Sequence, residues 1–162
     1  TPVRRGALIV GQLAGTLALG LFQAATYIGV GLAAGGHIEA GIPGALVLIA
    51  LATLITLAFG SIGLIAGMRA SSPENVQGLF PVVFVFLFIS SMAMPRNLIE
   101  TDWFRTIATY NPVSYMIEGI RSLLIFGWDT EALALGFGCA AAILAVALTV
   151  ASLSIKDRMV RT

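Results

Sequence analysis

The chain has 162 residues, of which 58% are hydrophobic and 10% are charged, and its formal net charge is +1. Its mean hydropathy of +0.97 lies well above that of a soluble globular domain. A chain of this length cannot enclose so much apolar surface in a polar shell, so a soluble fold is excluded, and the small net charge gives no sign of a nucleic-acid partner.

Four uncharged runs follow one another along the chain, at 6–36, 40–68, 75–95 and 132–155, and they hold 31, 29, 21 and 24 residues. A helix needs roughly 20 apolar residues to cross the hydrocarbon of a bilayer. We therefore predict an all-α polytopic membrane protein with a single transmembrane domain. Its four transmembrane helices are expected at approximately 7–34, 44–68, 73–94 and 132–155. Small residues at four-residue spacing, such as Gly136 and Ala140, predict close packing between helices.

The first predicted span carries polar residues on one face: Gln12, Thr16, Gln23 and Tyr27. At 3.6 residues per turn, these positions fall within roughly 60° of one another. Polar side chains are costly in hydrocarbon, so this face should meet protein or water. Two interpretations stay open: a substrate pathway, or hydrogen bonds between neighbouring helices.

The third predicted span should begin near Pro73, because Ser72 and Pro73 form a typical helix start and Glu74 follows in the first turn. Pro81 lies about two turns further along. A proline there removes a backbone hydrogen bond, so we predict a kink in this span at Pro81. The kink could serve packing alone or act as a hinge.

The stretch "TYNPVSYMIEGIRSLLIFGWD" interrupts the pattern of spans with charged residues. Asn111 and Pro112 together predict a helix start, and Gly127 predicts its end. The apolar residues Val113, Met116, Ile117, Ile120, Leu123 and Leu124 share one face, and Ser114, Glu118, Arg121 and Ser122 lie opposite.

A shorter amphipathic piece precedes this helix, with Trp103, Phe104, Ile107 and Tyr110 as its apolar residues. We predict a pair of short amphipathic helices at approximately 102–126, interfacial or re-entrant, before the last span. Glu118 and Arg121, three residues apart, are predicted to form a surface pair of about 0.3 kcal/mol.

The basic residues give an orientation. Arg4, Arg5, Arg69, Lys156, Arg158 and Arg161 fall on one side of the predicted spans. The opposite side has Arg96, Arg105 and Arg121, spread along the long third loop and accompanied by five acidic residues. The positive-inside rule then predicts that both termini lie in the cytoplasm and the long loop outside. We expect a multi-pass protein of the plasma membrane.

Three stretches carry a family resemblance: "TPVRRGALIVGQLAG", "SSPENVQGLFPVVFVFLFISSMAMP" and "WFRTIATYNPVSYMIEGIRSLL". In their order and spacing, the Phe-Pro, the Ser-Ser before Pro95 and the Asn-Pro followed by Tyr and Arg resemble the type-2 permeases of ATP-binding-cassette (ABC) exporters, in particular those of daunorubicin-resistance type. The resemblance covers the C-terminal two-thirds of the family pattern. Such permeases have six spans, so we expect two N-terminal spans and most of the coupling helix to lie outside this sequence.

The resemblance implies a permease subunit that pairs with a second permease copy or a paralogue and docks a separate ABC ATPase subunit. It also implies a substrate path for a hydrophobic or amphipathic molecule, an external gate helix with Asn111, Pro112, Tyr115, Glu118 and Arg121, and Arg4 and Arg5 near the ATPase. The one lysine, Lys156, precedes Asp157, whereas a phosphate-binding loop requires Gly-Lys-Ser/Thr. We therefore expect no enzymatic activity, cofactor or metal site in this chain, with ATP and magnesium on the partner. The alternative is an integral membrane scaffold that transports nothing.

Overall fold

The computed structural model describes residues 5–70, 72–78 and 80–160, and it places their side chains except those of 5–9, 73, 75 and 154–160. The described residues form helices and connecting turns, and no strand occurs among them, which confirms the predicted all-helical class. In chain order the elements are α1 (Arg5–Ala33), α2 (Gly41–Arg69), α3 (Pro73–Gln77), α4 (Phe80–Phe88), the 3₁₀ turn η1 (Arg96–Leu98), α5 (Asp102–Tyr110), α6 (Pro112–Arg121), the π-helical turn η2 (Ser122–Phe126) and α7 (Thr130–Val160).

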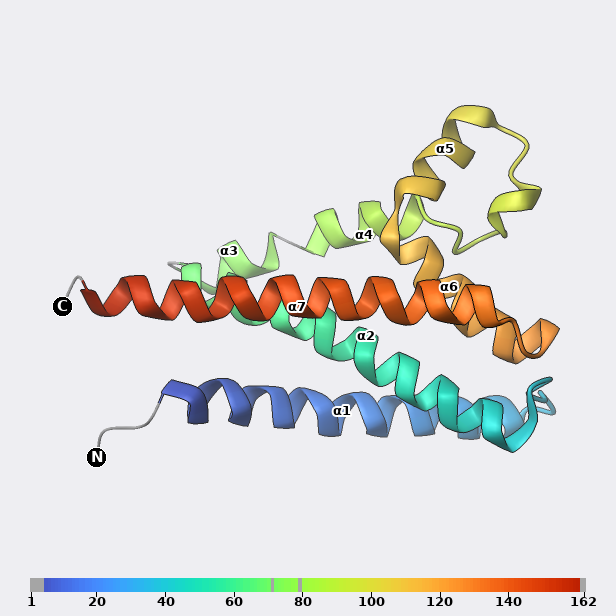
Figure 1. Cartoon of the computed structure of the whole chain (residues 1–162), viewed down its shortest axis with the longest axis horizontal. Helices are drawn as coiled ribbons and strands as arrows, with labels where there is room; N and C mark the ends of the chain where they lie inside the picture. Colours follow the sequence, from blue (N-terminus) through green and yellow to red (C-terminus); the bar gives the residue numbers. More distant parts are fainter. Residues whose placement is uncertain (1–4, 71, 79, 161–162) are drawn as a thin grey trace.

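Three helices of the described chain are long and apolar enough to cross a membrane: Val10–Ala33 within α1, Gly41–Arg69, which is α2, and Thr130–Leu153 within α7. Many of their large apolar side chains are exposed in the isolated chain, as expected for helices whose outer faces meet lipid. The beginning of α1 and the end of α7 lie at the same end of the long axis, and α5 and α6 lie toward the other end (Figure 1).

The segment 73–94 differs from the single kinked helix that the sequence predicted. A helix does begin at Pro73, but α3 ends at Gln77 and α4 begins at Phe80. Pro81 is thus the second residue of a new helix. Proline has no N–H to donate to the carbonyl four residues earlier, and its ring clashes with that carbonyl. For Pro81 the carbonyl is that of Gln77, where α3 ends, so the proline divides the helix. Neither piece alone is long enough to cross a bilayer, and the count of four spans is not confirmed.

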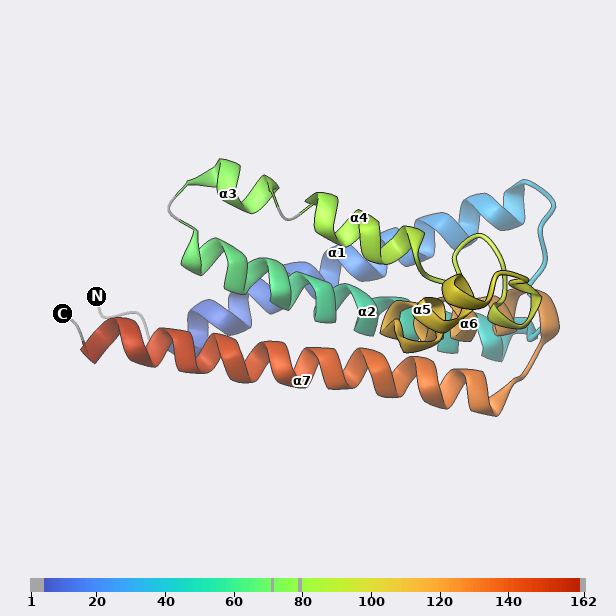
Figure 2. The ribbon, with the colours of Figure 1, turned by 90° about the horizontal axis from the view of Figure 1, so that it is seen from above.

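The centre of the bundle is α2, which packs against α1 on one side and α7 on the other, while α6 packs on α7 and α2 (Figures 1 and 2). The core lies toward the α6 end and contains Leu48, Leu51, Leu123 and Leu133. Gly119 of α6 faces Gly136 of α7, and a Cβ built on Gly136 would lie 3.1 Å from the carbonyl oxygen of Tyr115. The predicted small-residue contact at Gly136 is therefore present, and it lets α6 approach the start of α7 closely.

The connection between α1 and α2 is bound to the π-helical turn η2. The backbone N–H groups of Glu39 and Ala40 donate to the carbonyl oxygens of Leu124 and Leu123, at 3.4 and 3.1 Å. Leu123 and Leu124 lie in the last turn of the helical segment, where carbonyl oxygens have no partner within the helix. Gly127 then ends the helical segment with φ of +89°, a backbone conformation that favours glycine, and this end agrees with the sequence prediction.

Candidate functional site

Asn111 joins three elements at the start of α6. Its Oδ1 accepts a hydrogen bond from the backbone N–H of Val113 at 3.0 Å, and Pro112 follows as the first helical residue. This is the helix start that the sequence predicted. The Nδ2 of Asn111 donates to the carbonyl oxygen of Phe86 at 2.6 Å. The cap therefore also fixes the last turn of α4 against the junction of α5 and α6.

The polar face of α6 is not the open surface that the amphipathic pattern predicted. Ser114 and Ser122 are buried, and Glu118 and Arg121 are half-buried. The segment that follows α4 covers this face: the backbone N–H of Ser91 donates to Ser114 Oγ at 3.0 Å, and Ser91 Oγ donates to the Ser114 carbonyl at 3.1 Å. Arg121 Nη2 donates to the carbonyl oxygens of Ser91 and Met92 at 2.7 and 3.1 Å.

Glu118 forms its ion pair with Arg96 and not with Arg121, so the predicted surface pair is wrong. Arg96 Nε donates to Glu118 Oε1 at 2.8 Å and Nη2 donates to Oε2 at 2.6 Å. The two side chains are only 22% and 18% exposed. The Arg96 guanidinium also lies 4.1 Å from the centroid of the Tyr115 ring, a cation–π distance. The hydrogen bonds with Glu118 raise the pKa of Arg96 above its ordinary value, so the guanidinium stays charged.

Tyr115 contributes to this arrangement in a second way. Its hydroxyl donates to the carbonyl oxygen of Thr109 in the last turn of α5, at 2.9 Å. The ring under Arg96 is thereby held between α5, α6 and η1. Of the five residues predicted for the external gate helix, all lie at or within α6, and four of them (Asn111, Tyr115, Glu118 and Arg121) make contacts outside it. Their role in gating an external exit stays a prediction.

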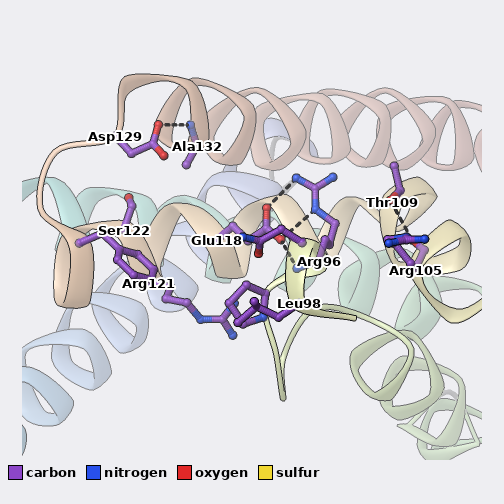
Figure 3. A pocket seen from close by; sticks show the side chains of 12 residues that line it. Arg96, Leu98, Arg105, Thr109, Glu118, Arg121, Ser122, Asp129 and Ala132 are labelled. Atoms are coloured by element: carbon purple, nitrogen blue, oxygen red, sulfur yellow. Dashed lines mark hydrogen bonds and ion pairs between the residues drawn. The ribbon is translucent and has the colours of Figure 1, made fainter. Parts of the chain in front are cut away.

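Between η1, α5, α6 and the start of α7 lies a cavity of about 600 Å³ (Figure 3). Its charged lining residues are Arg96, Arg105, Arg121, Glu118 and Asp129, and its apolar lining includes Leu98 and Phe126. Sequence reasoning identified Glu118 and Arg121 but missed Arg96 as the partner of Glu118. The two residues are 22 positions apart, and no helical periodicity connects them.

The polar face of α1 does not converge on one cavity. Gln12 and Thr16 line a hollow of about 790 Å³ between α1 and α2, together with Gly60 and Gly63. Tyr27 lines a different, mostly apolar cavity of about 390 Å³ beside α2 and α6. Gln23 is exposed. Thr16 Oγ1 donates to the Gln12 carbonyl of its own helix, which satisfies the hydroxyl locally. The pathway prediction for these four residues therefore remains open.

The two arginines predicted to lie near an ATPase, Arg4 and Arg5, are at the start of the chain. Arg4 falls outside the described residues, and Arg5 begins α1 while its side chain is not placed. Their predicted location near an ATPase stays a prediction. Among the described residues, no group of three or more His, Cys, Asp or Glu side chains is arranged to hold a metal ion.

With this geometry established, comparison with known families decides the class of protein. The model of the ABC-2 type transporter family matches residues 1–125. The chain belongs to this family. It is accordingly a multi-pass membrane protein and an ABC-2 membrane domain, the part of an ABC transporter that carries no ATPase motif of its own. Comparisons with curated proteins and with solved structures gave no significant match.

Proposed function

We propose that this ABC-2 protein is the permease subunit of an exporter in the plasma membrane and that a separate ATPase subunit drives it. The observation that carries the proposal is the family match over residues 1–125. The sequence adds support, because its one lysine, Lys156, is followed by Asp157, so these residues contain no Gly-Lys-Ser/Thr loop that could bind ATP phosphates. The apolar runs also lack carboxylates, which argues against coupling to ions.

We further propose that the segment 73–94 makes the fourth crossing and that a second permease copy, or a paralogue, covers it. None of the side chains placed in α4 is buried within this chain, and Phe84 and Phe88 are more than half exposed. In both views α4 lies at an edge of the bundle (Figures 1 and 2). A helix divided near Pro81 leaves backbone groups unpaired, and a bilayer tolerates these only where protein or water covers them. A partner at this edge would supply that cover and border a translocation path.

We also propose an orientation for the chain in the membrane and a chemical type for its substrate. The six basic residues of the predicted cytoplasmic side support cytoplasmic termini, and the shared location of the α1 start and the α7 end is compatible with this orientation (Figure 1). We propose a hydrophobic or amphipathic substrate because the resemblance to exporter permeases implies one. The likeness to daunorubicin-resistance permeases, based on the Asn-Pro and Phe-Pro stretches, stays a prediction about the type of cargo.

The decisive experiment reconstitutes the full-length permease into vesicles together with its ATPase subunit. Two preparations are compared: a wild-type ATPase, and a variant whose catalytic glutamate is replaced by glutamine. We expect ATP-dependent movement of a fluorescent amphipathic substrate with the first and none with the second. Equal transport in both preparations would exclude an ATP-driven permease. Absence of transport in both, with ATPase binding intact, would favour the scaffold alternative.

A further inference from the structure

The charges around the cavity of Figure 3 are not all paired within the chain. Arg96 pairs with Glu118, and Arg105 pairs with Asp102. Asp129 accepts hydrogen bonds from the backbone N–H groups of Glu131 and Ala132 and thereby caps α7. For Arg121, no carboxylate lies within ion-pair distance among the described residues, so its positive charge has no counter-ion there.

Arg121 also has unused hydrogen-bonding capacity. A guanidinium carries five N–H donors. Nη2 of Arg121 donates hydrogen bonds to the carbonyl oxygens of Ser91 and Met92. Its other terminal nitrogen, Nη1, is buried and has no hydrogen-bond partner among the described residues. A buried donor without an acceptor destabilises its surroundings. An anion that reached this guanidinium would supply both the missing charge and the missing acceptor.

The surroundings of the cavity indicate where such an anion would come from. Trp103, Tyr110 and Trp128 are all more than half exposed, and each lies within two positions of a residue that lines the cavity. Exposed Trp and Tyr side chains concentrate at the level of the lipid headgroups. Leu98 and Phe126, which line the cavity, are 58% and 71% exposed, so they can contact the apolar part of a lipid beside its headgroup.

We propose that this cavity binds the phosphate group of an anionic phospholipid, with Arg121 as its counter-ion. A guanidinium matches the geometry of phosphate oxygens. The lipid's chains extend along Leu98 and Phe126 into the bilayer. Every residue that lines the cavity belongs to this chain, so the proposal can be tested without the ATPase subunit.

The test uses the full-length permease in phosphatidylcholine vesicles, without the ATPase subunit. Trp103→Phe, together with replacement by Phe of any Trp outside residues 1–162, leaves Trp128, next to Asp129, as the reporter at the cavity. Lipids with brominated chains quench nearby Trp fluorescence. We expect brominated phosphatidylglycerol to be preferred over brominated phosphatidylcholine around Trp128 by about tenfold, the size of one charge-assisted hydrogen bond.

Three variants separate the roles of the arginines. Arg121→Gln should abolish the preference for phosphatidylglycerol, and Arg121→Lys should keep much of it because the charge remains. Arg105→Gln is the matched control: Arg105 lines the same cavity but already has Asp102 as its partner, so the preference should persist. Leu98→Glu tests the site without disturbing the hydrogen bonds of Arg121; a carboxylate on this exposed wall should remove the preference.

Each outcome decides the matter. A preference that survives both Arg121→Gln and Leu98→Glu overturns the proposal, as does equal quenching by the two lipids before any change at the cavity. If inorganic phosphate at millimolar concentration removes the preference, the site takes free phosphate and the assignment to a lipid is wrong. Failure of these binding tests would leave the ATP-driven transport experiment unaffected, so the two proposals fail separately.

Discussion

The Arg96–Glu118 pair allows a quantitative prediction, because it links the segment after α4 to α6 through one bidentate contact. The perturbation is a double-mutant cycle with Glu118→Gln, Arg96→Gln and both together. Glutamine keeps the size of glutamate and removes its charge; in place of Arg96 it removes the charge and is also shorter. In Glu118→Gln, the Arg96 guanidinium loses its counter-ion and keeps the Tyr115 ring, 4.1 Å away, and one neutral amide oxygen as acceptor. Glu118→Gln should therefore cost more stability than the pair's coupling energy alone.

The expected coupling energy of the Arg96–Glu118 pair follows from its hydrogen-bond distances and its burial. The two hydrogen bonds measure 2.8 and 2.6 Å, and hydrogen bonds to charged groups contribute about 1.5–3 kcal/mol. Fully exposed ion pairs contribute about 0–1 kcal/mol because water screens them. With side chains 22% and 18% exposed, the pair lies between these limits. We expect a coupling energy of about 2 kcal/mol, or about 4–8 °C in Tm for a chain of this size.

The assay is thermal unfolding in detergent, followed by the fluorescence of Trp103 and Trp128. Asp102→Asn is the matched control, because it breaks the Asp102–Arg105 pair, whose side chains are 87% and 47% exposed. That control should shift Tm by about 2 °C or less. If Glu118→Gln shifts Tm no more than Asp102→Asn does, the reasoning from burial is refuted. The result also bears on transport assays, since a loss of export in Glu118→Gln must be separated from a loss of stability.

The remaining predictions concern topology, packing and the face of α1. In a Cys139→Ala background, an impermeant thiol reagent added outside intact cells should label a cysteine at Gly36 and leave one at Ser72 unlabelled; labelling of the Ser72 position would reverse the orientation. Gly136→Val should lower stability by about 1–3 kcal/mol, because the larger side chain overpacks against α6; the measurement is Tm. Gly138→Val is the control and should not lower stability in this way, because a Cβ at Gly138 has no neighbour within 4 Å. If Gln12 lines a substrate pathway, Gln12→Leu should lower export at matched expression, and unchanged export would assign the residue to helix packing.

The sequence alone determined which segments are helical and where several of them begin. A helix in a membrane satisfies its backbone hydrogen bonds internally, so long uncharged runs favour helices, and α1, α2 and α7 lie within or over three of the four runs. The run at 75–95 is divided near Pro81 instead. Helix starts at Pro73 and Pro112 depend on adjacent residues, and the structure has both. The end before Gly127 is equally local, because it needs only a residue that tolerates positive φ.

Tertiary structure decided how the polar residues of α6 are used. Their spacing predicted an open polar face and a local pair between Glu118 and Arg121. The folded chain instead covers that face with the segment after α4, where Ser91, Met92 and Arg96 supply the partners. These partners lie 22 to 30 positions away along the chain, and helical periodicity relates only residues within a few turns. The burial of the Arg96–Glu118 pair, and the contacts of Arg121 with the Ser91 and Met92 carbonyls, exist only when the segment after α4 packs against α6.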